Sequence, residues 1–199
     1  MILGTHNSAT GGQLLWWLKP LAWLINPTSK CQNKTIQEQL MDGVKVFNMQ
    51  VAYINGKWRF SHGLALYKED VMLTIRQLRA WATKNEPIYI QLYLDRCFWC
   101  KQDTAAFTLL TAEVDELLYN SNCSLLTAWV KGTDDRYDGS DRPRINMDEH
   151  YWATSWAKVN ATSWIDRLPL PRRHAKMFNA TYKSECKKEY LMLDYYDYE

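Results

Sequence analysis

Short apolar segments recur along the chain and have the character of β-strands. They are rich in β-branched and aromatic side chains, and one of them follows the tight-turn signal Asn55-Gly56. The segments predicted as strands are Ile2 to Thr5, Val44 to Tyr53, Trp58 to Ser61, Pro87 to Asp95, Leu125 to Lys131 and Tyr190 to Tyr196, with a weaker candidate at Tyr151 to Ser155. The segment 87–95 is almost continuously apolar, which is typical of a strand buried on both faces.

Capped helical patterns lie between these strands. Thr35 and Glu38 form a capping box, and Gly43 ends that short helix just before the second strand. Asp70 and Asp103 each precede apolar residues at mostly helical spacing. The alternation of strands and helices predicts an α/β fold with a parallel sheet, either open or closed into a barrel. The polar, Gly- and Pro-containing segment 132–144 predicts a loop.

Length and composition favour a single domain over residues 1–199. A chain of 199 residues with 47% hydrophobic content is long enough for one substantial core and short for two. The 24 basic and 22 acidic residues nearly balance, so the charge predicts neither a nucleic-acid partner nor an acidic tail. No signal peptide or membrane-spanning segment is visible, and the odd number of cysteines, 5, fits a reducing compartment. We therefore expect a cytoplasmic protein, with peripheral contact to a membrane left open.

Two histidines follow predicted strands and are the leading candidates for chemistry. His6 comes at the end of the first strand, and His62 comes at the end of the third. In a parallel β/α architecture the carboxyl ends of the strands form the active face, so the two imidazoles are expected to converge there. Histidine changes protonation state near neutral pH, and a pair can therefore divide the work of general base and general acid.

The ordered motifs around these histidines resemble the X-type domain of phosphatidylinositol-specific phospholipase C. The motifs are Gly-Thr-His-Asn-Ser at 4–8, Gly-Val-Lys-Val-Phe-Asn-Met-Gln at 43–50, Asn-Gly-Lys-Trp at 55–58 and Ser-His-Gly-Leu at 61–64. The likeness continues less specifically through 86–92 and the terminal 191–195. It implies a compact, distorted or incomplete TIM-type (β/α) barrel.

The resemblance also implies a reaction and roles for three residues. The histidine at position 6 would deprotonate a headgroup hydroxyl that attacks phosphorus, and His62 would protonate the departing alkoxide. The product would be a cyclic phosphate that water opens later, with the histidines exchanging roles. Asp194 matches the carboxylate that orients the first histidine in bacterial members; read from the residues alone, it is equally a carboxylate that ends a strand.

The chain departs from the family pattern where charge is needed. Asn48 and Gln50 stand where family members carry an acidic residue followed by an arginine or a second acidic residue. Both amides are predicted to contact the substrate, although they supply neither a phosphate-facing cation nor calcium ligands. Asn7 and Tyr93 are further candidates for substrate contact. Lys131 is the candidate replacement cation, with a solvated strand-end lysine as the alternative.

No metal or other cofactor is predicted. The loss of the acidic ligands argues against calcium dependence. Cys97 and Cys100 have metal or redox spacing, but no second cysteine pair completes a zinc set, so we expect two buried thiols.

The segment Leu14 to Ile25 is strongly apolar and contains Trp16, Trp17 and Trp23. It is too short to cross a bilayer, which needs about 20 residues. It is either an interfacial element beside the active face, with its tryptophans among lipid headgroups, or a core helix under the barrel.

Three functions remain open from the sequence. The first is a metal-independent phosphodiesterase acting on a phosphoinositide lipid. The second is the same chemistry on a soluble nucleotide or cyclic phosphodiester. The third is a catalytically impaired protein that binds lipid headgroups, as the neutral Asn48 and Gln50 would suggest.

Overall fold

The computed structural model describes residues 2–84, 86–130, 147–150, 179–184, 186–188, 190–194 and 196–197. Its strands are β1 (Ile2–Thr5), β2 (Val46–Ile54), β3 (Lys57–His62), β4 (Ala65–Asp70), β5 (Ile88–Leu94), β6 (Cys123–Val130), β7 (Met147–His150) and β8 (Tyr190–Leu193). Its helices include the 3-10 turns η1 (Ser8–Gly11) and η2 (Lys19–Leu21), and α1 (Ala22–Ser29), α2 (Ile36–Met41), α3 (Val71–Trp81) and α4 (Thr104–Leu118). Residues 179–184 are also helical.

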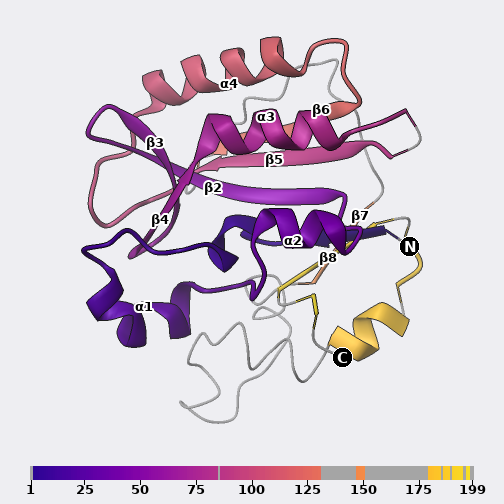
Figure 1. The fold of residues 1–199 in the computed structure, drawn as a ribbon, viewed down its shortest axis with the longest axis horizontal. Coiled ribbons are helices and arrows are strands. Elements are labelled where there is room, and N and C mark those ends of the chain that lie inside the picture. The colour runs from indigo at the N-terminus through magenta and orange to yellow at the C-terminus, as the bar shows by residue number, and fades with distance from the viewer. Residues whose placement is uncertain are drawn as a thin grey trace.

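Parallel strands form the main sheet in the order β7-β8-β1-β2-β5-β6. Strands β6 and β7 do not pair with each other in the described part of the chain, so the sheet is not closed into a barrel. Figure 1 shows α3 and α4 lying along one side of β2 and β5. Strands β1, β8 and β7 lie in the part of the molecule that also holds the two chain ends. The α/β class and the incomplete TIM-type barrel predicted from the sequence are confirmed.

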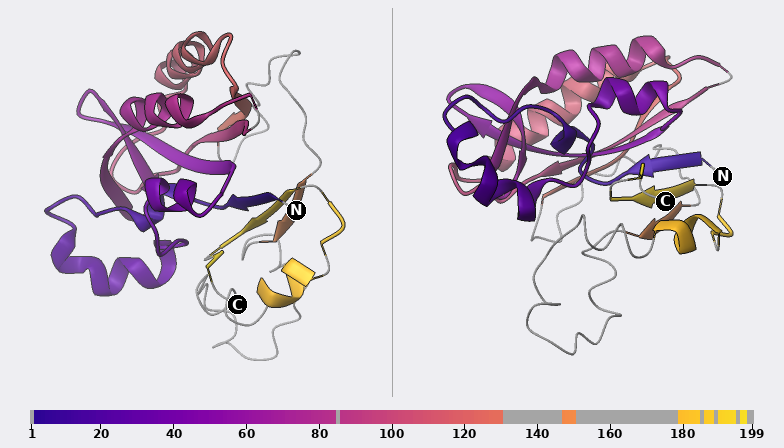
Figure 2. Two further views of the ribbon diagram at one scale, coloured as in Figure 1. Left: turned by 45° about the vertical axis from the view of Figure 1, so that its right-hand side comes forward. Right: turned by 60° about the horizontal axis from the view of Figure 1, so that its bottom comes forward.

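An antiparallel hairpin extends the sheet beyond β2. The first part of β2 pairs with β1 and β5, and its last residues, 51–54, pair with β3. Asn55 and Gly56 make the turn with positive φ angles of 50° and 75°, as the Asn-Gly signal predicts. Strand β3 therefore runs back toward the middle of β2 and continues through a second turn into β4 (Figure 2).

The two faces of the sheet have different chemistry. On the outer face, Phe47, Met49 and Leu92 belong to a large cluster that includes Ile75 of α3 and Phe107 of α4. These side chains are buried to 0% exposure, and each contributes about 1.5–3 kcal/mol through removal from water. Strand alternation places the neighbours of these residues on the inner face.

The inner face is apolar at one end and polar at the other. Val46, Leu126, Tyr190 and Met192 form a small buried cluster near the amino ends of β2 and β8. Further along the same face come buried polar residues, which the next subsection describes. The apolar cluster closes the base of the sheet, so the polar side chains gather at its carboxyl edge.

The capping signals in the sequence are confirmed. The Thr35 side chain accepts a hydrogen bond from the amide of Glu38, whose carboxylate in turn caps Thr35. Asp70 and Asp103 cap α3 and α4 through their carboxylates. These bonds satisfy amide groups that the first turn of a helix leaves without intrahelical partners.

Several elements differ from the sequence expectations. The pattern does not predict β4 or β7; the first completes the hairpin layer, and the second pairs with β8. Strand β8 ends at Leu193, earlier than predicted, because Asp194 turns away into the site. The loop 132–144, the weak strand 151–155 and Lys131 lie outside the described residues. No helix among the described residues is long and apolar enough to cross a membrane.

Candidate active site

His6 and Asp194 are brought together by two neighbouring parallel strands. Thr5 of β1 is in register with Leu193 of β8, so the next residue on each strand leaves the sheet at the same level. The His6 Nδ1 donates to the Asp194 Oδ1 at 2.8 Å, and the two residues are only 9% and 1% exposed. Asn179 donates to the Asp194 backbone carbonyl at 2.9 Å and steadies this turn. The carboxylate fixes one ring nitrogen of His6 as a donor, which leaves the Nε2 lone pair facing the site.

His62 reaches the same place by a route that differs from the sequence argument. It ends β3, which runs antiparallel to β2, so it is not carried to the active face as the carboxyl end of a parallel strand. The return of the hairpin brings its ring to 6.3 Å from the His6 ring, measured between centroids, at an interplanar angle of 86°. Its Nδ1 donates to the backbone carbonyl of Ser29 at 2.8 Å. A carbonyl can only accept, so this bond leaves the Nε2 of neutral His62 as an acceptor too.

Asn7 links the two imidazoles. Its side-chain Nδ2 lies 3.1 Å from the Nε2 of His6 and 3.2 Å from the Nε2 of His62. The residue is 1% exposed and adopts a left-handed backbone with φ 47°, a conformation that asparagine tolerates better than most residues. Its backbone amide donates to the Asn48 side-chain oxygen at 3.2 Å. Both Nε2 atoms therefore point at one small region, with a neutral amide between them.

Buried amides on β2 and β5 form the floor of this region. Asn48 donates to the Gln91 side chain at 2.9 Å, so the Asn48 amide is engaged on both of its atoms. Gln50 is 8% exposed and stands in register with Tyr93, whose ring lies 6.1 Å from that of Trp129. The predicted substrate contacts Asn48, Gln50 and Tyr93 thus share the inner face of the sheet. Asn7 lies beyond the end of β1 and joins them through its hydrogen bond to Asn48.

Several supporting residues escaped the sequence reasoning. Gln32 donates through one amide nitrogen to the carbonyls of His6 and Leu193, at 2.8 and 3.0 Å. The buried carboxylate of Asp95 accepts from the amide of Gly63, next to His62. Cys31 places its Sγ 3.8 Å from the Nδ1 of His62. The sequence offered one usable signal for such residues, namely single polar side chains within apolar segments, such as Gln91 in β5.

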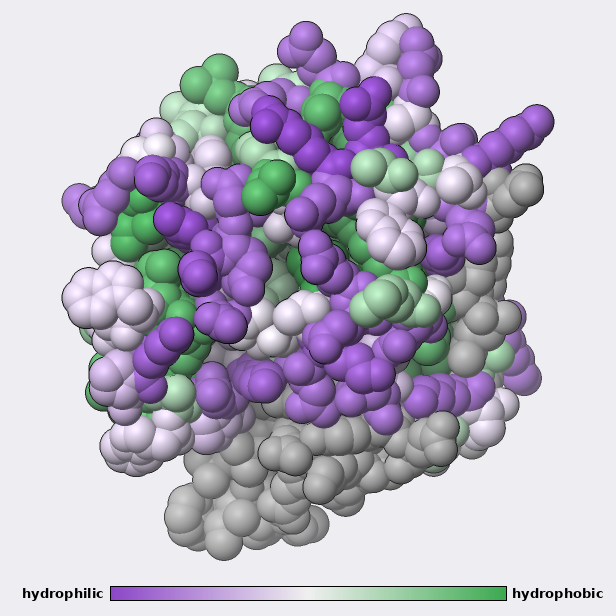
Figure 3. All heavy atoms as spheres, viewed as in Figure 1, coloured by the Kyte–Doolittle hydropathy of each residue, from purple (hydrophilic) through white to green (hydrophobic). Residues whose placement is uncertain are grey.

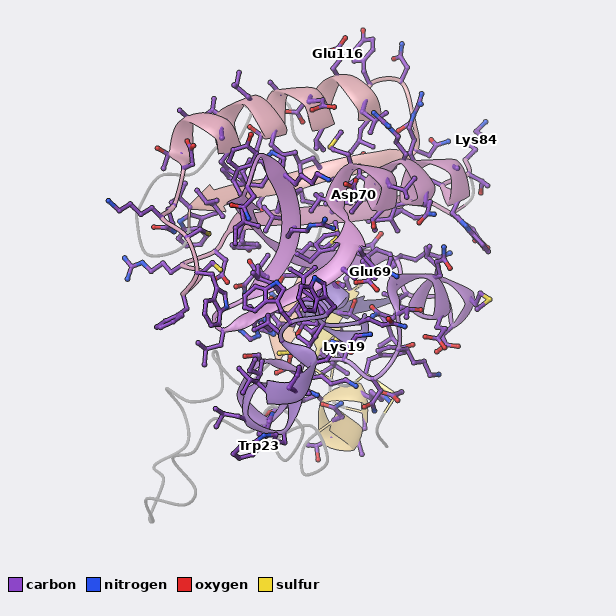
Figure 4. All side chains as sticks on the ribbon, turned by 60° about the vertical axis from the view of Figure 1, so that its left-hand side comes forward. Lys19, Trp23, Glu69, Asp70, Lys84 and Glu116 are labelled. Carbon is purple, nitrogen blue, oxygen red and sulfur yellow. The ribbon has the colours of Figure 1, made fainter. Side chains whose placement is uncertain are left out.

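The tryptophan-rich segment divides its side chains between the interior and solvent. Leu18 and Ile25 are buried, whereas Trp16 and Trp23 are 79% and 76% exposed. Figure 4 shows Trp23 on the outer side of α1, directed away from the sheet. The segment is thus neither a wholly buried core helix nor one continuous helix, because η2 and a Pro-containing α1 follow each other.

A second exposed aromatic turn meets this segment beside His62. Phe98 and Trp99 form a turn in which Phe98 is 70% exposed, and Trp99 packs edge-on against Trp17 at 4.9 Å between ring centroids. The Trp99 Nε1 donates to the Leu64 carbonyl at 2.8 Å. We call Trp16, Trp17, Trp23, Phe98 and Trp99 the aromatic rim. The face seen in Figure 3 carries mainly hydrophilic residues with scattered apolar groups.

The cysteines beside the rim are thiols with suppressed ionisation. Burial raises the pKa of Cys97 to about 12, and burial also raises the pKa of Cys100. Cys97 is buried, as predicted, whereas Cys100 is partly exposed. Neither thiol is ionised to a useful extent at neutral pH.

Comparison with known proteins supports the fold. No family model matches the sequence, and no curated protein matches it. A variant of phosphatidylinositol-specific phospholipase C from Staphylococcus aureus is similar in structure, with a TM-score of 0.61 at 14% identity, over 100% of this chain and 87% of that chain. The phosphatidylinositol-specific phospholipase C of Listeria monocytogenes gives a TM-score of 0.57 at 15% identity, over 98% and 87% of the two chains. The chain therefore has a phospholipase C-like phosphodiesterase fold.

Proposed function

We propose that this protein is a metal-independent phosphodiesterase that cleaves a phosphoinositide lipid by acid–base catalysis with His6 and His62. The Nε2 of His6 removes the proton from a headgroup hydroxyl next to the phosphate. The resulting oxygen forms a bond to phosphorus, and the bond to the lipid oxygen breaks. The protonated Nε2 of His62 gives its proton to that leaving oxygen, which yields a cyclic phosphate and a free alcohol.

The single observation that carries this proposal is the shared orientation of the two Nε2 atoms. Each histidine is anchored through Nδ1 to an acceptor, Asp194 for His6 and the Ser29 carbonyl for His62. Each Nε2 lies about one hydrogen bond from the same Asn7 amide nitrogen, at 3.1 and 3.2 Å. A phosphodiester that displaces this amide would have one nitrogen near the attacking oxygen and one near the leaving oxygen, and held geometry of this kind lowers the activation barrier.

Neutral amides meet the charge of the phosphate in this proposal. Asn48 and Gln50 occupy positions where a cation would stabilise the negatively charged transition state. The loss of one such donor typically reduces turnover by about 10²–10³-fold. We therefore propose slow turnover, with Lys131 as the candidate cation and with no requirement for calcium.

The aromatic rim supports a lipid substrate over a soluble one. It lies next to the His62 turn through the Trp99 to Leu64 hydrogen bond, so a bilayer in contact with the rim would present its headgroups near the histidines. Exposed Trp and Phe side chains are favourable at the boundary of headgroups and acyl chains. The structurally similar enzyme from S. aureus binds membranes, and we propose the same for this protein, as a peripheral contact.

Turnover measurements test the proposal. The protein should release a cyclic phosphate from phosphatidylinositol vesicles in the presence of a chelator. His6→Ala and His62→Ala should each reduce kcat by about 10²–10⁴-fold. His174→Ala is the matched control, because that histidine has no proposed role, and it should retain turnover.

The other outcomes identify the alternatives. Turnover confined to soluble nucleotide or cyclic phosphodiesters would replace the lipid substrate and keep the chemistry. Vesicle binding without turnover of any substrate would support the headgroup-binding protein, in which the Asn7 amide remains between the histidines.

A further inference from the structure

We infer that the same pocket forms an inhibitory site for a thiophilic divalent cation such as Zn²⁺, with His6, Cys31 and Asp194 as ligands. One ligand atom from each of these three residues lies within 4.8 Å of those of the other two, and all three residues are buried. Imidazole, thiolate and carboxylate together form a donor set that suits zinc better than magnesium or calcium. The inhibitory part of this inference rests on the proposed function, whereas the binding part does not.

Asn7 gives an independent indication that positive charge is favoured beside this ligand set. Its Nδ2, a group with positive hydrogens, contacts Cys31 Sγ at 3.6 Å, His6 Nε2 at 3.1 Å and His62 Nε2 at 3.2 Å. A hydrogen-bond donor thus stands among three lone-pair donors, as a cation would. The other end of this buried amide, Oδ1, has no hydrogen-bond partner among the described residues. A half-turn of the amide would direct Oδ1 toward the same lone pairs, and only a cation or added protons would make that arrangement favourable.

The ligands need modest movement to reach coordination distances. Zinc binds nitrogen and oxygen at about 2.0–2.2 Å and sulfur at about 2.3 Å, so neighbouring ligand atoms around tetrahedral zinc are roughly 3.3–3.8 Å apart. A pair at the 4.8 Å limit must therefore approach by about 1–1.5 Å. A water molecule completes the fourth position. His62 stays outside this set, because its Nδ1 is bonded to the Ser29 carbonyl and its Nε2 is not among the clustered ligand atoms.

Binding would release one proton and remove the general base. The Cys31 thiol loses its proton to solvent as the sulfur–zinc bond forms, and hydrating waters leave the ion. Because Asp194 lies against the Nδ1 of His6, an ion shared by these two residues takes Nδ1, and the proton of Nδ1 moves to Nε2. The protonated Nε2 then has no lone pair with which to deprotonate a substrate hydroxyl. Chelated protein should therefore be active, and one equivalent of Zn²⁺ should inhibit it.

Cobalt spectroscopy tests the binding without any reference to activity. Co²⁺ added alone to the full chain should give a sulfur-to-cobalt charge-transfer band and tetrahedral ligand-field bands, both saturating at one equivalent. Cys31→Ser should abolish the charge-transfer band. Cys31→Ala serves as a second variant, and the circular dichroism of both variants shows that they are folded. Cys100→Ser is the matched control, because Cys97 and Cys100 have metal-binding spacing in the sequence but lie outside the proposed site, and it should leave the band unchanged.

The activity measurement then separates the two proposals. In turnover of phosphatidylinositol vesicles, one equivalent of Zn²⁺ should reduce the wild-type rate at least tenfold, and Cys31→Ser should lower that ratio to below about twofold. A cobalt band that survives in Cys31→Ser but vanishes in Cys100→Ser overturns the site, as does the absence of any band. Zn²⁺ that saturates the site without inhibiting, or that activates, overturns the inhibitory role. If chelated protein shows no turnover, and Co²⁺ added to a separate sample without chelator gives the band, the proposed function is refuted and the metal site is supported.

Discussion

Asp194→Asn is the sharpest test of the proposed acid–base chemistry, because Asp194 acts on the reaction only through His6. The side chain is 1% exposed, and its Oδ1 accepts from the His6 Nδ1 at 2.8 Å. Asparagine keeps the shape and removes the negative charge that stabilises the imidazolium formed when His6 takes a proton. Asp194 is in this sense a positioning residue.

The size of the effect follows from the hydrogen bond that changes. A bond to a charged partner contributes about 1.5–3 kcal/mol, which corresponds to a loss of about 10- to 150-fold in kcat. If the new amide instead presents its NH₂ group to Nδ1, His6 must switch tautomer and its Nε2 carries the proton. The general base is then absent, and the loss should be on the order of 10⁴-fold. In either case KM should change little, since Asp194 does not contact the substrate in this proposal.

Two measurements check this prediction. Initial rates on phosphatidylinositol vesicles give kcat and KM for Asp194→Asn. Nitrogen NMR of the histidine rings reports which nitrogen of His6 carries the proton. Asp197→Asn is the matched control: Asp197 accepts from Asn33 at 3.1 Å and does not contact His6, so its kcat should stay within about twofold of wild type. The reasoning is refuted if Asp194→Asn also stays within twofold while His6→Ala is inactive.

Three further predictions follow from other parts of the structure. Trp23→Ala should weaken binding to anionic vesicles at least about fivefold in a sedimentation assay, because an exposed interfacial ring is lost. Trp81→Ala on α3 is the control and should leave binding unchanged. Equal effects of the two substitutions would show that Trp23 does not contact the membrane. Gln91→Leu should lower the free energy of unfolding by about 1–3 kcal/mol in urea titrations, because the buried Asn48 side-chain amide loses its hydrogen-bond acceptor. An unchanged midpoint of urea unfolding would show that this hydrogen bond does not stabilise the fold. Burial raises the pKa of Cys97 and of Cys123 from 9.0 to about 12, so the unfolded chain releases these protons first as the pH rises. The free energy of unfolding should therefore fall above pH 9 by about 1.4 kcal/mol per pH unit for each thiol. Cys123→Ala should remove the contribution of one thiol to this slope. An unchanged slope in Cys123→Ala would contradict the raised pKa of Cys123.

Local sequence signals determined the elements of this protein. Thr35, Asp70 and Asp103 each begin a helix where the capping pattern predicts it, because a side-chain oxygen three residues from an unpaired amide is a local arrangement. The apolar runs predicted the central strands to within a few residues, and the Asn55-Gly56 turn set the hairpin. The histidine motifs indicated the fold that the structural comparison supports.

Tertiary structure decided how these parts form a site. The sequence argument placed His62 at the active face as the end of a parallel strand, and this reason was wrong. His62 lies at the end of β3, which pairs antiparallel with the last residues of β2. Its anchor is the Ser29 carbonyl, and a backbone acceptor has no signature in the sequence because every residue carries one. The contact of Cys31 with Asn7 joins residues on separate segments, and the register of β1 with β8 aligns His6 with a residue 188 positions away. The residue types that can do the chemistry were therefore readable from the sequence, whereas the distances and partners that select one tautomer of each histidine came only from the folded chain.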